Sequence, residues 1–411
     1  MRNEQTDSAA ETRWRAPLVV ITAGCLIALL GFGARSSFGL FLEPMTSSRG
    51  WGRETFALAL AIQNLVWGLG VPVASMLADR FGPGKVLGLG ALVYAAGTWG
   101  MATATGATGL HLFGGVLAGL GIALTSFSIA LAAMARVVRP ERRSLILGIG
   151  TAAGSFGQVI YSPLSQLFIA EFGWETALII LAASVLVILP LAVFLPGGAN
   201  DGADAGFRQS IGEAIREAVA HRGFVLLTVG FFVCGFHVAF ITVHFPAYVS
   251  DIGLAPAVGA NAIAIIGLFN IVGAFLSGLA GQRWTKKSGL AAIYFLRALA
   301  ISALLLADKT ATNIYMFSAV MGILWLSTVP LTSGIVAQVF GVRYMATLFG
   351  FVFFGHQLGS FSGVWLGGYL YDTTGTYDVV WWAGVVLAVI AALIHLPINE
   401  QPLPRLVRQT A

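Results

Sequence analysis

Charge is what the sequence most conspicuously lacks: only 10% of its 411 residues are charged, whereas 57% are hydrophobic. About a quarter of the residues in an ordinary soluble domain are charged, so this composition excludes a soluble globular protein. Cysteine is almost missing too. Cys25 and Cys234 both lie in apolar stretches, where they suit helix packing better than a disulfide.

Sequence motifs of catalysis are also missing. The chain has no clustered metal-ligand spacing, no glycine-rich phosphate loop with its lysine and no nucleophile elbow. We therefore expect no enzymatic activity, no metal and no cofactor.

Long apolar runs are what the chain has instead. Each is long enough to cross about 30 Å of hydrocarbon. We predict an all-α membrane protein with twelve transmembrane helices, near residues 17–42, 55–77, 84–104, 108–135, 143–168, 174–195, 223–249, 257–280, 289–306, 312–338, 345–370 and 376–397. The first sixteen residues are polar and the first run is too long for a signal peptide, so no cleavable signal is expected.

The basic residues are distributed unevenly between the two ends of these helices. With the N-terminus placed inside, 18 of the 23 Lys and Arg residues fall in cytoplasmic segments, and the outer loops hold only Arg49, Arg53 and Lys309. The positive-inside rule then places both termini in the cytoplasm of a bacterial-type inner membrane. The net charge of +5 reflects this topology, and no nucleic-acid partner is expected.

The two halves of the sequence repeat each other at an offset of 202 residues. Pro44 falls on Pro246, Gly148 on Gly350 and Gly173 on Gly375. Such a repeat predicts two pseudo-symmetric six-helix bundles with a site between them near the membrane midplane. The expected organisation is a cytoplasmic tail (1–16), an N-terminal bundle (17–195), a cytoplasmic linker with an amphipathic helix (196–222), a C-terminal bundle (223–397) and a second cytoplasmic tail (398–411).

The loop Asp79-Arg80-Phe81-Gly82-Pro83-Gly84-Lys85 resembles the signature between helices two and three of the major facilitator superfamily, although Ser75 replaces the usual first Gly. The runs 37–45, 142–148 and 369–377 resemble bacterial monocarboxylate transporters and oxalate/formate exchangers. The resemblance implies a major facilitator fold and a small organic anion as substrate. It also implies a gating or bracing role for Asp79, Arg80, Gly82, Lys85, Arg136 and Arg143.

The chain departs from this family in helix eight. Monocarboxylate transporters commonly carry an Asp and an Arg there, but the aligned positions are Asn270 and Ala274. The eukaryotic lysine of helix one aligns with Ser36, beside Arg35. A cation for a carboxylate must therefore come from elsewhere, and Arg35 is available.

Arg35 lies in a stretch of about 25 residues with no other charge, and a charge at such depth usually faces a cavity or a partner. Its repeat counterpart is His237, and His244 follows on the same helix face. We expect Arg35 and these histidines to cradle an anion; the alternatives are a snorkelling or packing arginine and histidines bonded to backbone carbonyls.

Other polar residues within the spans are weaker candidates, because they often only join helices. His356 in helix eleven aligns with a region where the exchangers place a cation. The remaining predicted binding residues are Gln357, Asn270, Asn64, Tyr161 and Trp325. Arg297, in a peripheral helix, is expected to be structural.

Acidic residues are missing from the span interiors, with Glu43 the nearest. A proton, if one is coupled, would be carried by His237, His244, His356 or the substrate. We predict a monomeric secondary transporter that moves a small organic anion, a monocarboxylate, by alternating access. The alternatives are an exporter of neutral or amphipathic compounds and a non-transporting membrane sensor.

Overall fold

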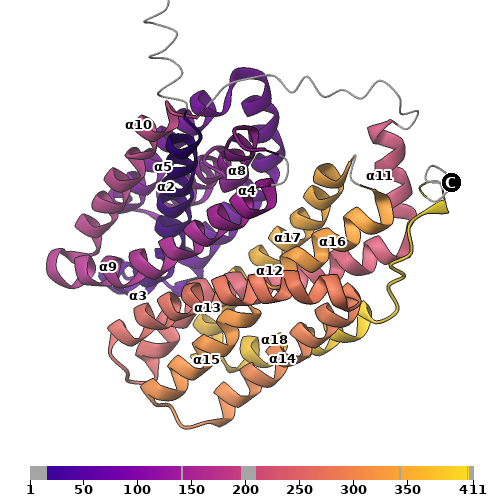
Figure 1. Ribbon diagram of the computed structural model, residues 1–411. Helices are drawn as coiled ribbons and strands as arrows, with labels where there is room; N and C mark the ends of the chain where they lie inside the picture. Colours follow the sequence, from indigo (N-terminus) through magenta and orange to yellow (C-terminus); the bar gives the residue numbers. More distant parts are fainter. Residues whose placement is uncertain (1–15, 140–141, 196–209, 342–343, 405, 407–411) are drawn as a thin grey trace, which may run out of the picture.

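The computed structural model describes residues 16–139, 142–195, 210–341, 344–404 and 406, and every regular element within these ranges is helical. The predicted tail 1–15, linker residues 196–209 and the tail end 407–411 lie outside the described residues. The helices form two groups, one before and one after the linker (Figure 1).

The first group, the N-bundle, ends before the linker. Its elements are α2 (Pro17–Ser36), η1 (Phe38–Phe41), α3 (Leu42–Arg49), α4 (Arg53–Phe81), α5 (Pro83–Thr103), α6 (Ala107–Leu110), η2 (His111–Leu117), α7 (Ala118–Leu124), α8 (Phe127–Arg136), α9 (Arg143–Leu186) and α10 (Ile188–Ala192). A short helix, α11 (Ile211–Ala220), precedes the second group, the C-bundle. That bundle comprises α12 (Arg222–Asp251), α13 (Pro256–Arg283), α14 (Lys286–Leu306), α15 (Ala311–Leu324), α16 (Thr328–Phe340), α17 (Met345–Thr374) and α18 (Asp378–His395).

Ten candidate membrane spans occur within the described residues. One of them, Leu145–Ala192, reverses at Gly173, whose φ of +78° breaks the helical backbone, and it therefore supplies two crossings. Helix α17, which carries the polar pair His356–Gln357, adds a further 30-residue helix. The predicted all-α membrane fold is confirmed. The predicted helices 143–168 and 174–195 are joined directly by a sharp turn at Gly173, with no loop between them.

Several of the described crossings are interrupted, which the apolar runs did not predict; three of these interruptions lie in the first, fourth and tenth crossings. The first helix changes course between α2 and α3, at η1. The fourth crossing breaks at Thr125-Ser126, between α7 and α8, and the tenth breaks at 325–327, between α15 and α16. Ser and Thr favour such points because their hydroxyls can satisfy the backbone groups that a broken helix releases.

The bundles touch along α4 and α17, along α9 and α13, and where η1 meets α12. At the last contact Gly39 lies so close to the backbone of Thr242 and Val243 that a Cβ would collide with it. We call the end of the molecule that holds residues 50–53, 251 and 372–378 the far end, and the end that holds Asp79, Arg136 and α11 the terminal end. The bundles meet toward the far end and diverge toward the terminal end (Figure 1).

Candidate functional site

Arg35 lies in the last turn of α2, partly buried, at the level where the two bundles meet. Its Nη2 donates to Oδ1 of Asn64 on α4 at 2.7 Å. The Asn64 amide is fixed in turn, because its Nδ2 donates to the Leu60 carbonyl at 2.8 Å. The guanidinium also lies over the Trp67 ring, 4.3 Å from its centre, in a cation–π contact.

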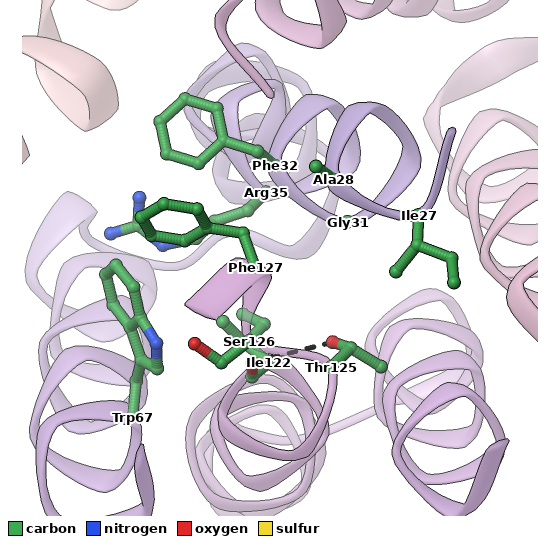
Figure 2. Close-up of a pocket in the computed structure, with 10 residues that line it drawn as sticks. All are labelled: Ile27, Ala28, Gly31, Phe32, Arg35, Trp67, Ile122, Thr125, Ser126 and Phe127. Carbon is green, nitrogen blue, oxygen red and sulfur yellow. Dashed lines mark hydrogen bonds between the residues drawn. The ribbon is translucent and has the colours of Figure 1, made fainter. Parts of the chain in front are cut away.

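Two recesses meet at Arg35. The first opens within the N-bundle and is lined by Ile27, Ala28, Gly31, Phe32, Arg35, Trp67, Ile122, Thr125, Ser126 and Phe127 (Figure 2). The second lies between the bundles and is lined by Arg35, Phe38, Leu60, Gln63 and Asn64 from one side and by Ala239, Thr242 and Val243 from the other. Arg35 is common to both, so it stands at the boundary between them.

Arg35 retains hydrogen-bonding capacity. Within the described residues, its Nε is buried without a partner, and none of the ion pairs involves it. A guanidinium remains protonated in proteins and presents a planar fork that matches a carboxylate. The Nε edge of Arg35 can therefore accept an anionic ligand.

The site is connected to helix α17 of the opposite bundle. Gln357 Nε2 donates to the Asn64 carbonyl at 3.2 Å, and the Phe353 ring meets the Trp67 ring edge-on, with centres 5.4 Å apart. His356 stacks on Phe353 at 5.7 Å. The structure thus brings Asn64 and Gln357 to Arg35 and places His356 one ring further away.

His237 is placed differently from the prediction. Its Nε2 is hydrogen bonded to the Gly384 carbonyl of α18 at 2.9 Å, within its own bundle. The expected pairing with Arg35 across the pseudo-twofold axis is therefore wrong for this conformation. The repeat fixes the position of His237 along α12, but not the direction in which its side chain points.

His244 is likewise occupied within the C-bundle. Its Nε2 lies 2.8 Å from the Val364 carbonyl and its Nδ1 lies 3.1 Å from the Tyr377 hydroxyl. Both ring nitrogens are used, which is the packing alternative considered above. The predicted cradle of one arginine and two histidines is not formed.

Asn270 lies at the other contact between the bundles. Its Nδ2 donates to Ser155 Oγ of α9 at 3.0 Å, and its Oδ1 accepts from the backbone N–H of Leu326 at 3.0 Å. Asn270 therefore ties the break in the tenth crossing to the N-bundle. Tyr161, in contrast, donates to Ser184 within the N-bundle at 3.0 Å.

Arg297 is fully buried inside the C-bundle. Its Nη2 donates to the carbonyls of Leu324 and Trp325, at 2.7 and 2.5 Å, where the tenth crossing is broken. Trp325, predicted to line the cavity, is only 1% exposed and contributes this carbonyl. Arg297 thus supplies donors to backbone groups that the broken helix leaves without a helical partner.

The family signature forms a brace inside the N-bundle. Arg136 Nη2 donates to Asp79 Oδ1 at 2.8 Å and joins the ends of α8 and α4. Gly82, with φ of +92°, makes the turn into α5, which contains Lys85, while Arg80 lies over the neighbouring Phe81 ring. Arg143 begins α9. Asp79 and Arg136 belong to one bundle, so in this conformation their ion pair joins its helices and not the two bundles.

At the far end, the bundles are joined by a cluster that we call the seal: Arg53, Glu54, Asp251, Trp365, Asp372 and Tyr377. Arg53 donates to both carboxylate oxygens of Asp251, at 2.6 and 2.7 Å, and to the Tyr377 hydroxyl at 2.9 Å. The Asp372 carboxylate accepts from the backbone N–H groups of Arg53 and Glu54, so it caps the start of α4 from the opposite bundle. The seal closes the far end.

Sequence reasoning missed the aromatic rings of the first recess and the seal. Trp67 and Phe127 lie in apolar runs, where a ring that lines a cavity looks the same as one that packs in the core. Arg53, Asp251 and Asp372 lie at span ends, where charges are ordinary. The scarcity of outer-loop cations was the one signal that could have marked Arg53.

Comparisons with known proteins agree with this architecture. Residues 24–364 match the model of the Major Facilitator Superfamily. Monocarboxylate transporter 13 of Bos taurus is 26% identical, with 92% of this chain and 89% of that protein covered. YcxA, an uncharacterised transporter of the superfamily type from Bacillus subtilis strain 168, is 25% identical over 88% of this chain and 90% of that protein.

Among solved structures, a bacterial homologue of the human lysosomal transporter Spinster, in an inward-facing and occupied conformation, superposes with a TM-score of 0.73 at 15% identity. The superposition covers 94% of this chain and 98% of the homologue's chain. A D-xylose–proton symporter superposes with a TM-score of 0.69 at 14% identity, over 94% and 99% of the two chains. At these identities the likeness concerns the fold alone.

Proposed function

Because the chain belongs to the Major Facilitator Superfamily, a family of transporters and not of enzymes, we propose that it carries a small organic anion, a monocarboxylate, across a bacterial inner membrane by alternating access. The sequence similarity to monocarboxylate transporter 13 of Bos taurus supports this choice of substrate.

The observation that carries the proposal is Arg35. It is a permanent cation at membrane depth, and its Nε has no partner within the described residues. It lies where the recess of the N-bundle meets the recess between the bundles. A ligand on Arg35 would therefore contact the boundary that must open and close in alternating access.

Alternating access requires each end to open while the other is shut. The seal joins the bundles at the far end, and the brace of Asp79 and Arg136 lies within one bundle at the terminal end. With both termini cytoplasmic, as the distribution of Lys and Arg suggests, this conformation opens to the cytoplasm. Outward opening requires the contacts of Arg53 and Asp372 to break.

If a proton accompanies the anion, the histidine near the site that could carry it is His356. His356 reaches Arg35 through Phe353 and Trp67, whereas His237 and His244 bind backbone carbonyls within the C-bundle. His356 is thus the residue to test for proton coupling.

Arg35→Gln tests the proposal. The variant keeps a polar side chain but loses the charge, and a hydrogen bond to a charged group contributes about 1.5–3 kcal/mol. We expect carboxylate affinity in proteoliposomes to fall by about ten- to hundredfold. Arg216→Gln, an exposed arginine on α11, is the matched control and should leave transport unchanged.

An unchanged carboxylate flux in Arg35→Gln would contradict the proposal. Transport of neutral or amphipathic compounds by both forms would then favour the exporter, with Arg35 in a structural role.

A further inference from the structure

The surroundings of Arg35 point to a narrower substrate class. Resting on the proposed function, we infer that the preferred cargo is an apolar monocarboxylate with an aromatic ring and without hydroxyl or amino groups near the carboxylate. Its carboxylate would lie on Arg35, and its ring would lie among Phe32, Trp67 and Phe127.

Charge limits the cargo to one carboxylate. Among the described residues that line the two recesses, Arg35 is the only charged one. A second carboxylate would leave water without a counter-charge, and burying an unpaired charge is strongly unfavourable. An ammonium group would face the guanidinium with no acidic partner, so amino acids are disfavoured as well.

The unpaired hydrogen-bonding groups of the recess lining further favour a cargo whose polar atoms accept hydrogen bonds. Two of the described residues that line the recesses carry a buried N–H group without a partner: Arg35 at Nε and Trp67 at Nε1. Figure 2 shows the Trp67 indole nitrogen on the side of the ring that faces Ser126 and Ile122. Both groups can only donate, so they suit carboxylate oxygens and cannot satisfy a hydroxyl proton.

Several hydroxyl and amide groups of the lining already form hydrogen bonds within the protein. Thr125 Oγ1 donates to the Gly121 carbonyl at 2.8 Å, and Ser126 Oγ is bonded to Ser128 Oγ at 2.8 Å. Asn64 uses its oxygen for Arg35 and its amide nitrogen for the Leu60 carbonyl. These groups therefore offer a hydroxyl on the cargo fewer hydrogen bonds than water does.

Aromatic side chains form the walls that remain. In Figure 2 the Phe127 ring overlaps the Arg35 side chain and the Phe32 ring lies above it, while the guanidinium lies over the Trp67 ring. Phe127 is 38% exposed and lines the first recess, so a ligand there can contact its side chain in this conformation. A ring on the cargo can pack against these faces in offset or edge-on geometry.

Equilibrium binding to the purified full-length protein in nanodiscs tests the inference, with phenylacetate, acetate, lactate, malonate and phenylalanine as probes. We expect phenylacetate to bind at least about tenfold more tightly than acetate, because each apolar increment in a fitted pocket changes selectivity by about ten- to two-hundredfold. Lactate, malonate and phenylalanine should bind no better than acetate.

Two variants locate the selectivity. Phe127→Ala should weaken phenylacetate about tenfold and leave acetate unchanged. Phe127→Leu, which loses the ring but keeps more apolar volume than alanine does, should weaken phenylacetate less and guards against misfolding. Phe156→Ala is the matched control, because Phe156 is 46% exposed and lies outside both recesses.

The outcomes separate this inference from the proposed function. If lactate or malonate binds as tightly as phenylacetate and Arg35→Gln removes that binding, the aromatic preference is wrong and an anion transporter remains. If no carboxylate binds the wild type, the proposed function fails. If phenylacetate is preferred but Phe127→Ala and Phe156→Ala behave alike, the ring lies elsewhere and the inference is overturned.

Discussion

Arg53 provides the sharpest test of the conformational reasoning, because its partners lie on the opposite bundle. The change is Arg53→Gln, which removes the charge while keeping a polar side chain. The Arg53 side chain is 12% exposed and that of Asp251 is 25% exposed, so the pair lies between the surface and buried limits. Exposed pairs contribute about 0.2–1 kcal/mol, and breaking a buried pair costs about 3–5 kcal/mol.

We therefore expect Arg53→Gln to destabilise the conformation with a closed far end by about 1–3 kcal/mol. The contacts to Asp251 and Tyr377 cannot persist when the far end opens, so the loss falls on the closed conformation alone. Each 1.4 kcal/mol is a factor of ten in the equilibrium. The population open at the far end should rise by about five- to hundredfold.

Thiol labelling measures this change. A Thr242→Cys reporter lies in the recess behind the seal and is read in a Cys25→Ser background, with Cys234 fully buried. A membrane-impermeant maleimide applied from the far end should label the reporter faster in the presence of Arg53→Gln. Arg49→Gln is the matched control, because its ion pair with Glu175 lies at the same end but within the N-bundle. Equal labelling rates in the Arg53 and Arg49 variants would refute the assignment of the seal.

Two other predictions concern stability. Arg297→Leu removes the donor to the Leu324 and Trp325 carbonyls, so the free energy of unfolding should fall by about 2–3 kcal/mol. The control Arg283→Gln, at the exposed end of α13, should leave the thermal midpoint unchanged. A higher midpoint for Arg297→Leu would show that the cost of burying the charge exceeds the contribution of its hydrogen bonds. At the start of α11, Ser210 and Glu213 form a helix cap, and hydrogen bonds from Ser210, first from its backbone N–H, hold the pKa of Glu213 below its ordinary value. The stability that this cap adds is fully present above about pH 4.3 and is lost as the pH falls through the lowered pKa. Amide exchange in α11 of the full chain should therefore rise with acidification, and a Ser210→Ala variant should show fast exchange at every pH.

The sequence sufficed for the fold because membrane spans are specified by length and hydropathy, which a single chain displays directly. It also made Arg35 a candidate site residue, since a charge in hydrocarbon is energetically costly wherever its side chain points. The interruptions at Thr125–Ser126 and 325–327 were missed because short polar residues inside an apolar run are equally compatible with an unbroken helix.

His237 shows where the reasoning from the repeat fails. An offset of 202 relates backbone positions, and the site depends on side-chain direction. His237 turns to the Gly384 carbonyl because an apolar bundle interior offers its N–H few other acceptors. The seal was hidden for a different reason: Arg53, Asp251 and Asp372 are distant in sequence, and only the packing of two bundles brings them together.

The fourth and tenth crossings break at matching positions, but the side chains beside the breaks differ, which is why the anion site is expected in only one bundle. The break at Thr125-Ser126 coincides, under the offset of 202, with Ser327-Thr328 at the edge of the break in the tenth crossing. An intramembrane arginine accompanies each break, yet these arginines are not counterparts, because Arg35 falls on His237 and Arg297 falls on Ala95.

The halves thus share a backbone interruption and use different side chains beside it. Arg297 is 0% exposed and is committed to two carbonyls at the break. Arg35 instead binds an amide on α4 and borders two recesses. Both arginines keep buried N–H groups without a partner within the described residues, so the difference between them is access. Of the two arginines, Arg35 is therefore the one that an exchangeable anion can reach, whereas Arg297 stabilises the interior of the C-bundle.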